Sequence, residues 1–392
     1  MSVSRRVAGQ LQQASWIRRM FEEGARLRAE RGPDAVFDFT LGNPEVEPPE
    51  IVTETLRRVA AEARPHSHGY MPNAGFPDVR EAIARRLAAR TGRPYTAEHI
   101  LMTSGAAGAI NVALKAMLDP GDEVIVLVPY FPEYRFYIEN HGGVVVPVET
   151  GARFEPDPER IAAAITPRTR AIIINSPNNP TGAIYGAEEL RAIERVIAPH
   201  ADVAVISDEP YRALVYDGQS APEPAAFIGR ALIADSWSKS MAVAGERIGY
   251  LALAPGSADW AAMRDACTFA NRVLGYVNAS AIWQRIVKEA GDAVIDIGGY
   301  QKKRDMLCTA LARIGYQVEK PAGAFYVFPR SPVADDVAFI GLLVREGILA
   351  VPGSGFGRAG YFRLSLTVPL QTIEASLTGF ERAFAAARVT AS

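Results

Sequence analysis

The residue of this chain best suited to covalent chemistry is Lys239, in the segment Ser-Trp-Ser-Lys that begins at Ser236. Apolar runs at 230–235 and 248–253 flank the segment and predict two buried strands of an α/β sheet. A lysine held between core strands is desolvated, and the neutral amine that desolvation favours is the nucleophile that forms a Schiff base with a carbonyl group. The segment therefore predicts a lysine that binds a carbonyl compound, although a lone lysine after a strand is also typical of a solvated loop.

Ser236 and Lys239 also match the Ser-x-x-Lys signature of the penicillin-binding serine acylases, in which the serine is the nucleophile. Those enzymes carry two companion tripeptides, Ser-Asp-Asn and Lys-Thr-Gly. Neither tripeptide occurs in this chain, which favours the lysine as the reactive group.

Two polar residues, Asn179 and Asp208, follow apolar runs that predict further strands. Asn179 lies in the turn Asn-Ser-Pro-Asn-Asn-Pro-Thr-Gly at the end of the run 169–175, and Asp208 follows the run 201–206. Because ligands of open parallel sheets lie outside the carboxyl ends of the strands, these side chains can share one site. The octapeptide is more specific than an ordinary turn, whereas an aspartate after a strand is also typical of a helix cap.

Small residues and an aromatic residue occupy two more strand ends. Gly105, Ala106 and Ala107 lie between a predicted strand and a predicted helix, where free N–H groups and the helix dipole favour an anion. Small residues also suit any tight strand–helix junction. Phe131 follows the run 123–128 and can cover a flat ring there, although a core aromatic is an equally good interpretation.

Taken in order along the chain, these motifs resemble the fold-type I pyridoxal-phosphate-dependent aminotransferases of class I/II, the aspartate aminotransferase-like family. Ser-x-Ser-Lys at 236–239, followed by Gly-x-Arg-x-Gly at 245–249, is similar to the cofactor-lysine segment of that family. The resemblance extends over nearly the entire chain and implies that Lys239 binds pyridoxal 5′-phosphate as a Schiff base. It also implies that the phosphate is bound by Ser236, Arg247 and the backbone N–H groups of Gly105, Ala106 and Ala107.

The resemblance further implies how the cofactor ring is held. Phe131 lies on the face of the pyridine ring, and Asn179 and Tyr211 bind its 3′-oxygen. Asp208 contacts the ring nitrogen, where a buried carboxylate keeps the nitrogen protonated so that the ring can accept electrons. Lys239, Asp208 and Tyr211 are thus the expected catalytic group.

Substrate and subunit contacts are implied in the same way. Gly42 and Asn179 line the substrate pocket, and Arg363, in an Arg-Leu-Ser strand, binds the substrate carboxylate. A planar guanidinium suits that bidentate contact better than an ammonium group does. Tyr70, in the loop 68–75, is expected to reach the active site of a neighbouring subunit, which implies a homodimer.

The implied reaction moves an amino group between an L-amino acid and a 2-oxo acid by a ping-pong mechanism. Lys239 would carry the proton in both half-reactions. Carbon–sulfur β-lyases and related synthases share these residues, so they remain the alternative reaction. A pyridoxal-phosphate-binding transcription regulator would need a DNA-binding domain, for which we expect no room before Gly42.

The identity of the amino donor stays open at this point. Some aspartate-specific relatives place a lysine in the small-residue turn, to hold the distal carboxylate, and this chain has Ala107 there. Arg272 could supply a distal charge, but a surface arginine is also expected at such a position. A dicarboxylic donor and an apolar or aromatic donor both fit these residues.

Composition narrows the class of protein further. The chain has 392 residues and a formal net charge of −2, which does not indicate a nucleic-acid-binding surface. Its two cysteines, Cys267 and Cys308, lie far apart, so we expect neither a disulfide nor a metal site, and a reducing cytoplasm suits them. No apolar run is long enough to span a bilayer, and no signal peptide is expected, so we predict a soluble cytoplasmic protein.

The elements that must position these residues follow an α/β pattern. Strand and helix signals alternate from about residue 100 to 253, which predicts a mostly parallel sheet flanked by helices. A long helix from about 287 to 314 is expected to lead into a smaller α+β domain. We therefore predict a large cofactor-binding domain over 48–288 and a small domain formed by 1–47 together with 289–392.

One further motif is rejected. Residues 355–360 form a literal Gly-x-Gly-x-x-Gly, but the residues that follow predict an aromatic strand. A dinucleotide site requires a helix there, so no such site is expected.

Overall fold

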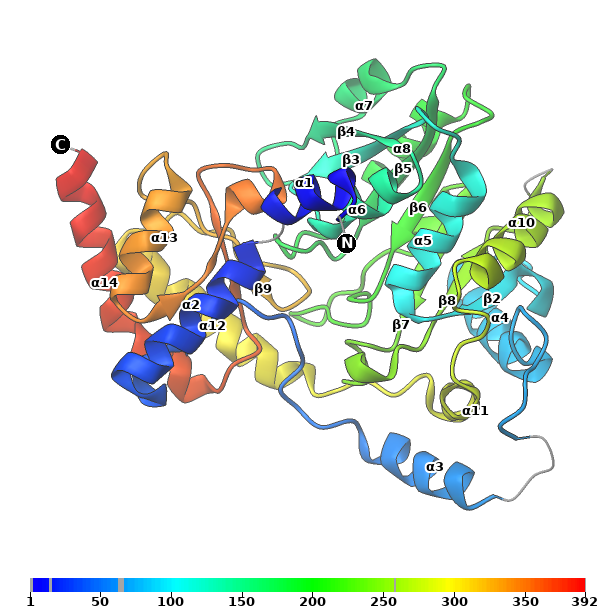
Figure 1. Cartoon of the computed structure of the whole chain (residues 1–392), viewed down its shortest axis with the longest axis horizontal. Coiled ribbons are helices and arrows are strands. Elements are labelled where there is room, and N and C mark those ends of the chain that lie inside the picture. The colour runs from blue at the N-terminus through cyan, green and yellow to red at the C-terminus, as the bar shows by residue number, and fades with distance from the viewer. Residues whose placement is uncertain (1–2, 14–15, 63–66, 257–258, 392) are drawn as a thin grey trace.

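The computed structural model describes residues 3–13, 16–62, 67–256 and 259–391, and its larger part is built on a seven-stranded sheet (Figure 1). The strand order is β2-β8-β7-β6-β5-β3-β4. β8 runs antiparallel to both of its neighbours, and the remaining pairs are parallel, which confirms the predicted α/β class. The strands are β2 (Ile100–Thr103), β3 (Glu123–Val128), β4 (Val144–Glu149), β5 (Thr169–Asn175), β6 (Ala204–Asp208), β7 (Ala231–Ser236) and β8 (Gly249–Leu253).

Helices cover both faces of this sheet, and the side chains of the central strands alternate between the two faces. In β3, Ile125 and Leu127 belong to the hydrophobic cluster on one face, and Val124 and Val126 to the cluster on the other. The first face is covered by α3 (Glu50–Ala61), α4 (Pro77–Thr91), α7 (Pro158–Ala164), α8 (Ala187–Ile197), α9 (Pro224–Phe227) and α11 (Ala281–Ala290). The second is covered by α5 (Gly105–Met117), α6 (Glu133–Asn140) and α10 (Trp260–Val273).

The smaller part lies to the left of the sheet in Figure 1 and has a core of its own, rich in aromatic rings. The N-terminal segment joins it because β1 pairs in parallel with β10. Its strands are β1 (Phe37–Asp38), β9 (Tyr326–Val327), β10 (Ile348–Leu349), β11 (Val351–Pro352) and β12 (Phe362–Ser365). Its helices are α2 (Trp16–Arg31), α12 (Ile297–Ile314), α13 (Asp336–Arg345) and α14 (Leu370–Ala391), and α1 (Arg5–Gln13) precedes them.

The single long helix predicted over 287–314 is wrong, because α11 and α12 are separate helices. Gly291 occupies the C-cap of α11, and the Asp296 side chain caps α12 by accepting a hydrogen bond from the N–H of Gly298. A cap with its own hydrogen bond starts a new helix after the interruption. After the Gly-x-Gly-x-x-Gly motif, strand β12 follows and not a helix, which removes the basis for a dinucleotide site.

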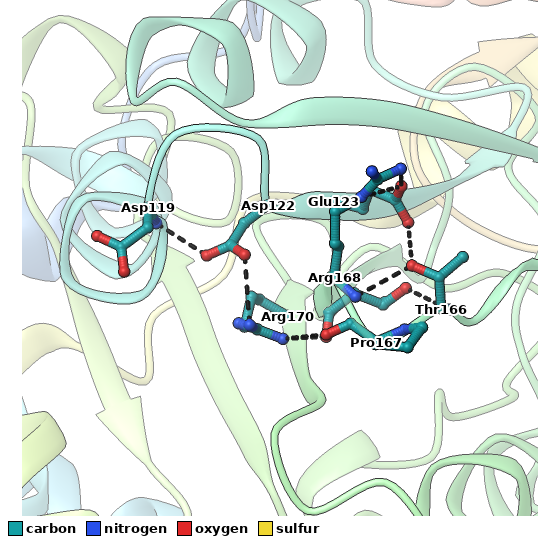
Figure 2. A network of polar contacts seen from close by, with 8 residues as sticks. Asp119, Asp122, Glu123, Thr166, Pro167, Arg168 and Arg170 are labelled. Atoms are coloured by element: carbon teal, nitrogen blue, oxygen red, sulfur yellow. Dashed lines mark hydrogen bonds and ion pairs between the residues drawn. The ribbon is translucent and has the colours of Figure 1, made fainter.

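The amino ends of β3 and β5 carry a network of polar side chains (Figure 2). The Glu123 carboxylate accepts hydrogen bonds from Thr166 Oγ1 at 2.6 Å and from Arg168 Nε at 3.0 Å. Asp122 accepts from the Asp119 N–H and forms an ion pair with Arg170. Polar groups at this end of the sheet therefore pair with one another. Within the described ranges, no helix is both long and apolar enough to cross a membrane.

Candidate active site

A cavity of about 320 Å³ lies at the carboxyl ends of the parallel strands, where residues of the smaller part also contribute to its wall. Strands β5, β6 and β7 end at this cavity, as parallel strands with helical crossovers place their carboxyl ends along one edge. Most of the predicted site residues line it, namely Gly42, Ala106, Ala107, Phe131, Asn179, Asp208, Tyr211, Ser236, Lys239, Arg247 and Arg363.

Lys239 lies in the turn that follows β7, and its Nζ donates a hydrogen bond to the carbonyl of Gly42 at 2.6 Å. Burial, together with the nearby charges of Arg247 and Arg363, lowers the pKa of Lys239 to about 8, against the opposing effect of Asp208. An amine with this pKa has a larger neutral fraction near neutral pH than an ordinary lysine has, and the neutral form can act as a nucleophile or as a base.

Asp208 is the last residue of β6, and its side chain is buried. The Tyr134 hydroxyl donates a hydrogen bond to Oδ2, while Oδ1 has no hydrogen-bond partner among the described residues. Burial raises the pKa of Asp208 to about 7; the Tyr134 hydrogen bond opposes this rise, and the charge of Asp235 adds to it. The carboxylate therefore needs a donor at Oδ1, and the protonated nitrogen of a pyridine ring meets that need.

Asn179 is joined to the Asp208 strand through Asn175, the last residue of β5. The Asn175 side chain donates to the backbone carbonyl of Asp208 at 2.8 Å and accepts from the Asn179 N–H at 2.7 Å. These two bonds tie the Asn-Pro-Thr-Gly turn to the neighbouring strand end and hold Asn179 beside the cavity.

Arg363 on β12 is buried without a carboxylate partner among the described residues. Its Nη1 donates to Asn179 Oδ1 at 3.0 Å, its Nη2 donates to the Thr40 carbonyl at 2.5 Å, and its Nε has no partner. Desolvation lowers the pKa of Arg363 from its ordinary value. Because a buried guanidinium without an anion is costly, the arrangement suits a carboxylate supplied by a ligand.

The opposite end of the cavity is suited to an anion. Gly105 begins α5 with a φ of +71°, a conformation that favours glycine, and an added Cβ would lie 2.7 Å from an Arg247 guanidinium nitrogen. The N–H groups of Ala106 and Ala107 lie in the first turn of α5, and Ser236 ends β7 beside them. Helix N–H groups, a hydroxyl and a guanidinium together fit a phosphate group.

Tyr211 and Phe131 have partners that sequence reasoning did not identify. The hydroxyls of Tyr211 and Tyr326 lie 2.9 Å apart, and Tyr326 also lines the cavity. The ring of Phe131 contacts Tyr134 edge-on, with ring centroids 5.5 Å apart. The only sequence signal for Tyr134 is its spacing of one helical turn from Phe131.

Tyr70 does not line the cavity of its own chain, and its side chain is 93% exposed. Its contact with a neighbouring subunit stays a prediction. No group of three or more described His, Cys, Asp or Glu side chains is arranged to hold a metal ion.

Comparison with known proteins identifies the family. The model of the family "Aminotransferase class I and II" matches residues 34–379. The aspartate/prephenate aminotransferase of Thermus thermophilus is 37% identical over 90% of this chain and 91% of its own length. The aspartate aminotransferase of Geobacillus stearothermophilus is 32% identical over 97% of this chain and 98% of its own.

Solved structures agree with this assignment. An amino transferase from Eubacterium rectale superposes with a TM-score of 0.94 at 35% identity, covering 98% of this chain and 99% of that one. The aspartate aminotransferase of Thermus thermophilus with maleate superposes with a TM-score of 0.86 at 33% identity, covering 98% and 100%. The chain therefore belongs to the class I and II aminotransferases, enzymes of fold type I that use pyridoxal phosphate to move an amino group between an amino acid and a 2-oxo acid.

Proposed function

We propose that transamination takes place in this cavity, with a separate role for each of Lys239, Asp208 and Arg363. One observation supports the proposal. Two buried atoms of the cavity wall, Asp208 Oδ1 and Arg363 Nε, have no hydrogen-bond partner among the described residues, and Lys239 lines the same wall. One atom needs a donor and the other needs an acceptor. A cofactor ring nitrogen and a substrate carboxylate would satisfy them.

The cofactor itself would be held by residues that already surround the cavity. When bound, pyridoxal phosphate supplies a carbonyl group for the amine and an electron-accepting ring for charge that develops on the substrate. Lys239 would bind the carbonyl carbon, and Asp208 would pair with the ring nitrogen. The remaining contacts would be made to the phosphate by Ser236, Arg247, Gly105, Ala106 and Ala107, to the ring face by Phe131, and to the 3′-oxygen by Asn179 and Tyr211.

The chain's own side chains would then orient the substrate and move its proton. Arg363 binds the α-carboxylate, with Gly42 and Asn179 beside it, and this contact aims the substrate Cα at Lys239. The lowered pKa of Lys239 would let its Nζ take a proton from the Cα of the amino donor and, in the reverse half-reaction, give a proton to the Cα of the amino acid that forms. Asp208 would favour a protonated ring nitrogen, because Oδ1 of its buried carboxylate has no hydrogen-bond partner among the described residues.

We further propose that the enzyme accepts donors with apolar or aromatic side chains at least as well as L-aspartate. The cationic residues of the described cavity wall are Lys239, Arg247 and Arg363, and each has a role already. Ala107 offers a methyl group where some aspartate-specific relatives are expected to have a lysine. The similar proteins named for aspartate and prephenate make L-aspartate the reference donor for this comparison.

We also propose a cytoplasmic homodimer in which Tyr70 reaches the neighbouring cavity. The exposed ring of Tyr70 and the exposed apolar side chains Phe269 and Val273 on α10 support such an interface. The division into domains 48–288 and 1–47 with 289–392 is supported by a hydrophobic cluster that comes mainly from 1–47 and 289–392, although Tyr211, Leu214 and Tyr216 also belong to it.

An absorption spectrum of the purified protein with pyridoxal phosphate tests the proposal. We expect a visible band that Lys239→Ala abolishes, that a matching L-amino acid converts to the amino form, and that a 2-oxo acid restores. A panel that includes L-aspartate, L-leucine and L-phenylalanine ranks the donors. Release of ammonia and pyruvate would instead indicate a β-lyase, and the absence of any band would contradict the proposal.

A further inference from the structure

Residues 39–47, which we call the strap, connect β1 to α3, and Thr40, Leu41 and Gly42 of the strap line the cavity. Two of its carbonyl groups accept hydrogen bonds from the cations of the site: Thr40 from Arg363 Nη2 and Gly42 from Lys239 Nζ. The position of the strap therefore decides where the free Lys239 amine points.

The strap packs closely on the smaller part at Gly42. A Cβ added to Gly42 would lie 1.7 Å from the hydroxyl of Tyr326, so the backbone already packs directly on that side chain. The carbonyl of Leu41 is held by the Thr367 hydroxyl at 2.7 Å. These contacts hold the strap from one side, and the contacts of its far end also act on the position of the Gly42 carbonyl.

Glu45 provides that anchor through helix α12. Its carboxylate forms an ion pair with Lys303, and its backbone N–H donates to the Tyr300 hydroxyl at 3.3 Å. The Lys303 side chain is 11% exposed and the Glu45 side chain 23%, so water screens this pair less than it screens a surface pair. Lys303 Nζ also lies 5.1 Å from the centroid of the Tyr300 ring, a cation–π contact.

The same helix supports Lys239 from a second direction. The ring of Tyr300 packs against Phe325, with centroids 5.4 Å apart, and the Phe325 ring centroid lies 6.0 Å from Lys239 Nζ. Lys303 and Tyr300 thus connect to Lys239 both through the strap and through an aromatic pair.

We propose that Lys303 is a positioning residue for the reaction: its ion pair with Glu45 holds the strap so that the Gly42 carbonyl directs the Lys239 amine. An amine that is already oriented loses less conformational freedom when it transfers a proton, which is why positioning speeds the step. This role of Lys303 rests on the proposed function of Lys239 and adds residues outside the cavity wall to it.

The test compares Lys303→Gln with Lys302→Gln. The second variant removes the same charge from the preceding position of α12, which is exposed. We expect Lys303→Gln to lower kcat by about three- to tenfold, with a smaller change in KM, while Lys302→Gln stays within about twofold. In the protein without cofactor, we expect the amides of the strap to exchange hydrogen faster in Lys303→Gln. Lys303→Arg, which keeps the charge, should restore most of both properties.

Exchange of the two charges is the sharper variant. Glu45→Lys combined with Lys303→Glu should recover part of the kcat lost by either single change, because the pair forms again in reverse. The proposal is overturned if Lys303→Gln matches Lys302→Gln in kcat, or if the strap loosens while kcat stays constant. If the visible cofactor band persists in Lys239→Ala, the proposed function itself is overturned. If the band is lost in Lys239→Ala, an unchanged kcat in Lys303→Gln contradicts the role of Lys303 alone.

Discussion

The two ends of the seven-stranded sheet each carry a buried carboxylate, and the two carboxylates differ in their hydrogen bonds and in the direction of their pKa shifts. At the amino end, Glu123 is paired with Thr166 and Arg168, and these hydrogen bonds lower its pKa (Figure 2). At the carboxyl end, Asp208 has a hydrogen bond from Tyr134 at one oxygen and none at the other, and burial raises its pKa to about 7.

The difference separates a structural carboxylate from a functional one. A polar group whose partners all come from the same chain contributes to folding and leaves nothing for a ligand to satisfy. A buried group with an unpaired atom is costly in the free protein, and binding of a ligand removes that cost. Arg363 differs from Arg168 in the same respect, because its Nε has no partner.

The largest expected difference in kcat is between two single variants, each of which makes one of these carboxylates neutral. Asp208→Asn removes the charge proposed to keep the ring nitrogen protonated, so we expect kcat to fall by about 100-fold or more. Glu123→Gln should keep kcat within about twofold and should instead lower the free energy of unfolding. Steady-state kinetics and thermal unfolding of both variants check this, and equal activity losses would break the comparison.

Substitution of Arg363 and of Arg168 should also have different effects, here on KM for the amino donor. Arg363→Lys replaces a planar guanidinium by a point charge, so we expect KM for the amino donor to rise by about 10- to 100-fold. Arg168→Lys, at an exposed side chain on the other end, should leave KM unchanged. A similar KM in both variants would show that Arg363 does not bind the substrate carboxylate.

A smaller effect is expected from the hydroxyl that holds Asp208. Tyr134→Phe removes the hydrogen bond to Oδ2 and keeps the ring beside Phe131, so kcat should fall by about three- to tenfold. The visible band should also change its pH dependence. Tyr316→Phe is the control, because it removes a buried hydroxyl that donates to the Phe380 carbonyl in the smaller part. Tyr316→Phe should lower the free energy of unfolding without changing kcat. An unchanged kcat in Tyr134→Phe would contradict the assigned contact of Tyr134 with Asp208.

The smallest effect concerns stability and pH in the protein without cofactor. Burial raises the pKa of Asp208 from 3.8 to about 7, so its contribution to stability is present below pH 3.8 and is lost as the pH rises through 7. Asp208→Asn should therefore gain stability relative to the wild type between pH 4 and 8. The pKa of Glu123 is lowered, so Glu123→Gln should lose relative stability as the pH rises from acid to neutral. Melting temperatures across pH check both signs, and parallel curves would contradict them.

Continuous apolar runs were enough to predict the sheet, because strands buried on both faces need apolar side chains at every position. β3 illustrates this, since its residues 124–128 are all apolar and buried, and Glu123 at its amino end is buried with polar partners. The runs flanking Lys239 likewise correspond to β7 and β8. The break between α11 and α12 was missed, because Gly291 and Asp296 act through caps that an apolar pattern does not report.

By itself, the sequence determined the sheet and the residues that stand at its strand ends, because these depend on local order along the chain. Only the tertiary structure decided which partners those residues have. Tyr134 lies 74 residues from Asp208, and Tyr326 lies 115 residues from Tyr211. The ion pair of Glu45 with Lys303 likewise joins the N-terminal strap to α12. The contact of Tyr211 with Tyr326 forms when the smaller part packs over the carboxyl ends of the strands, and the other two form when distant segments of one part pack together. No spacing along the chain records that packing.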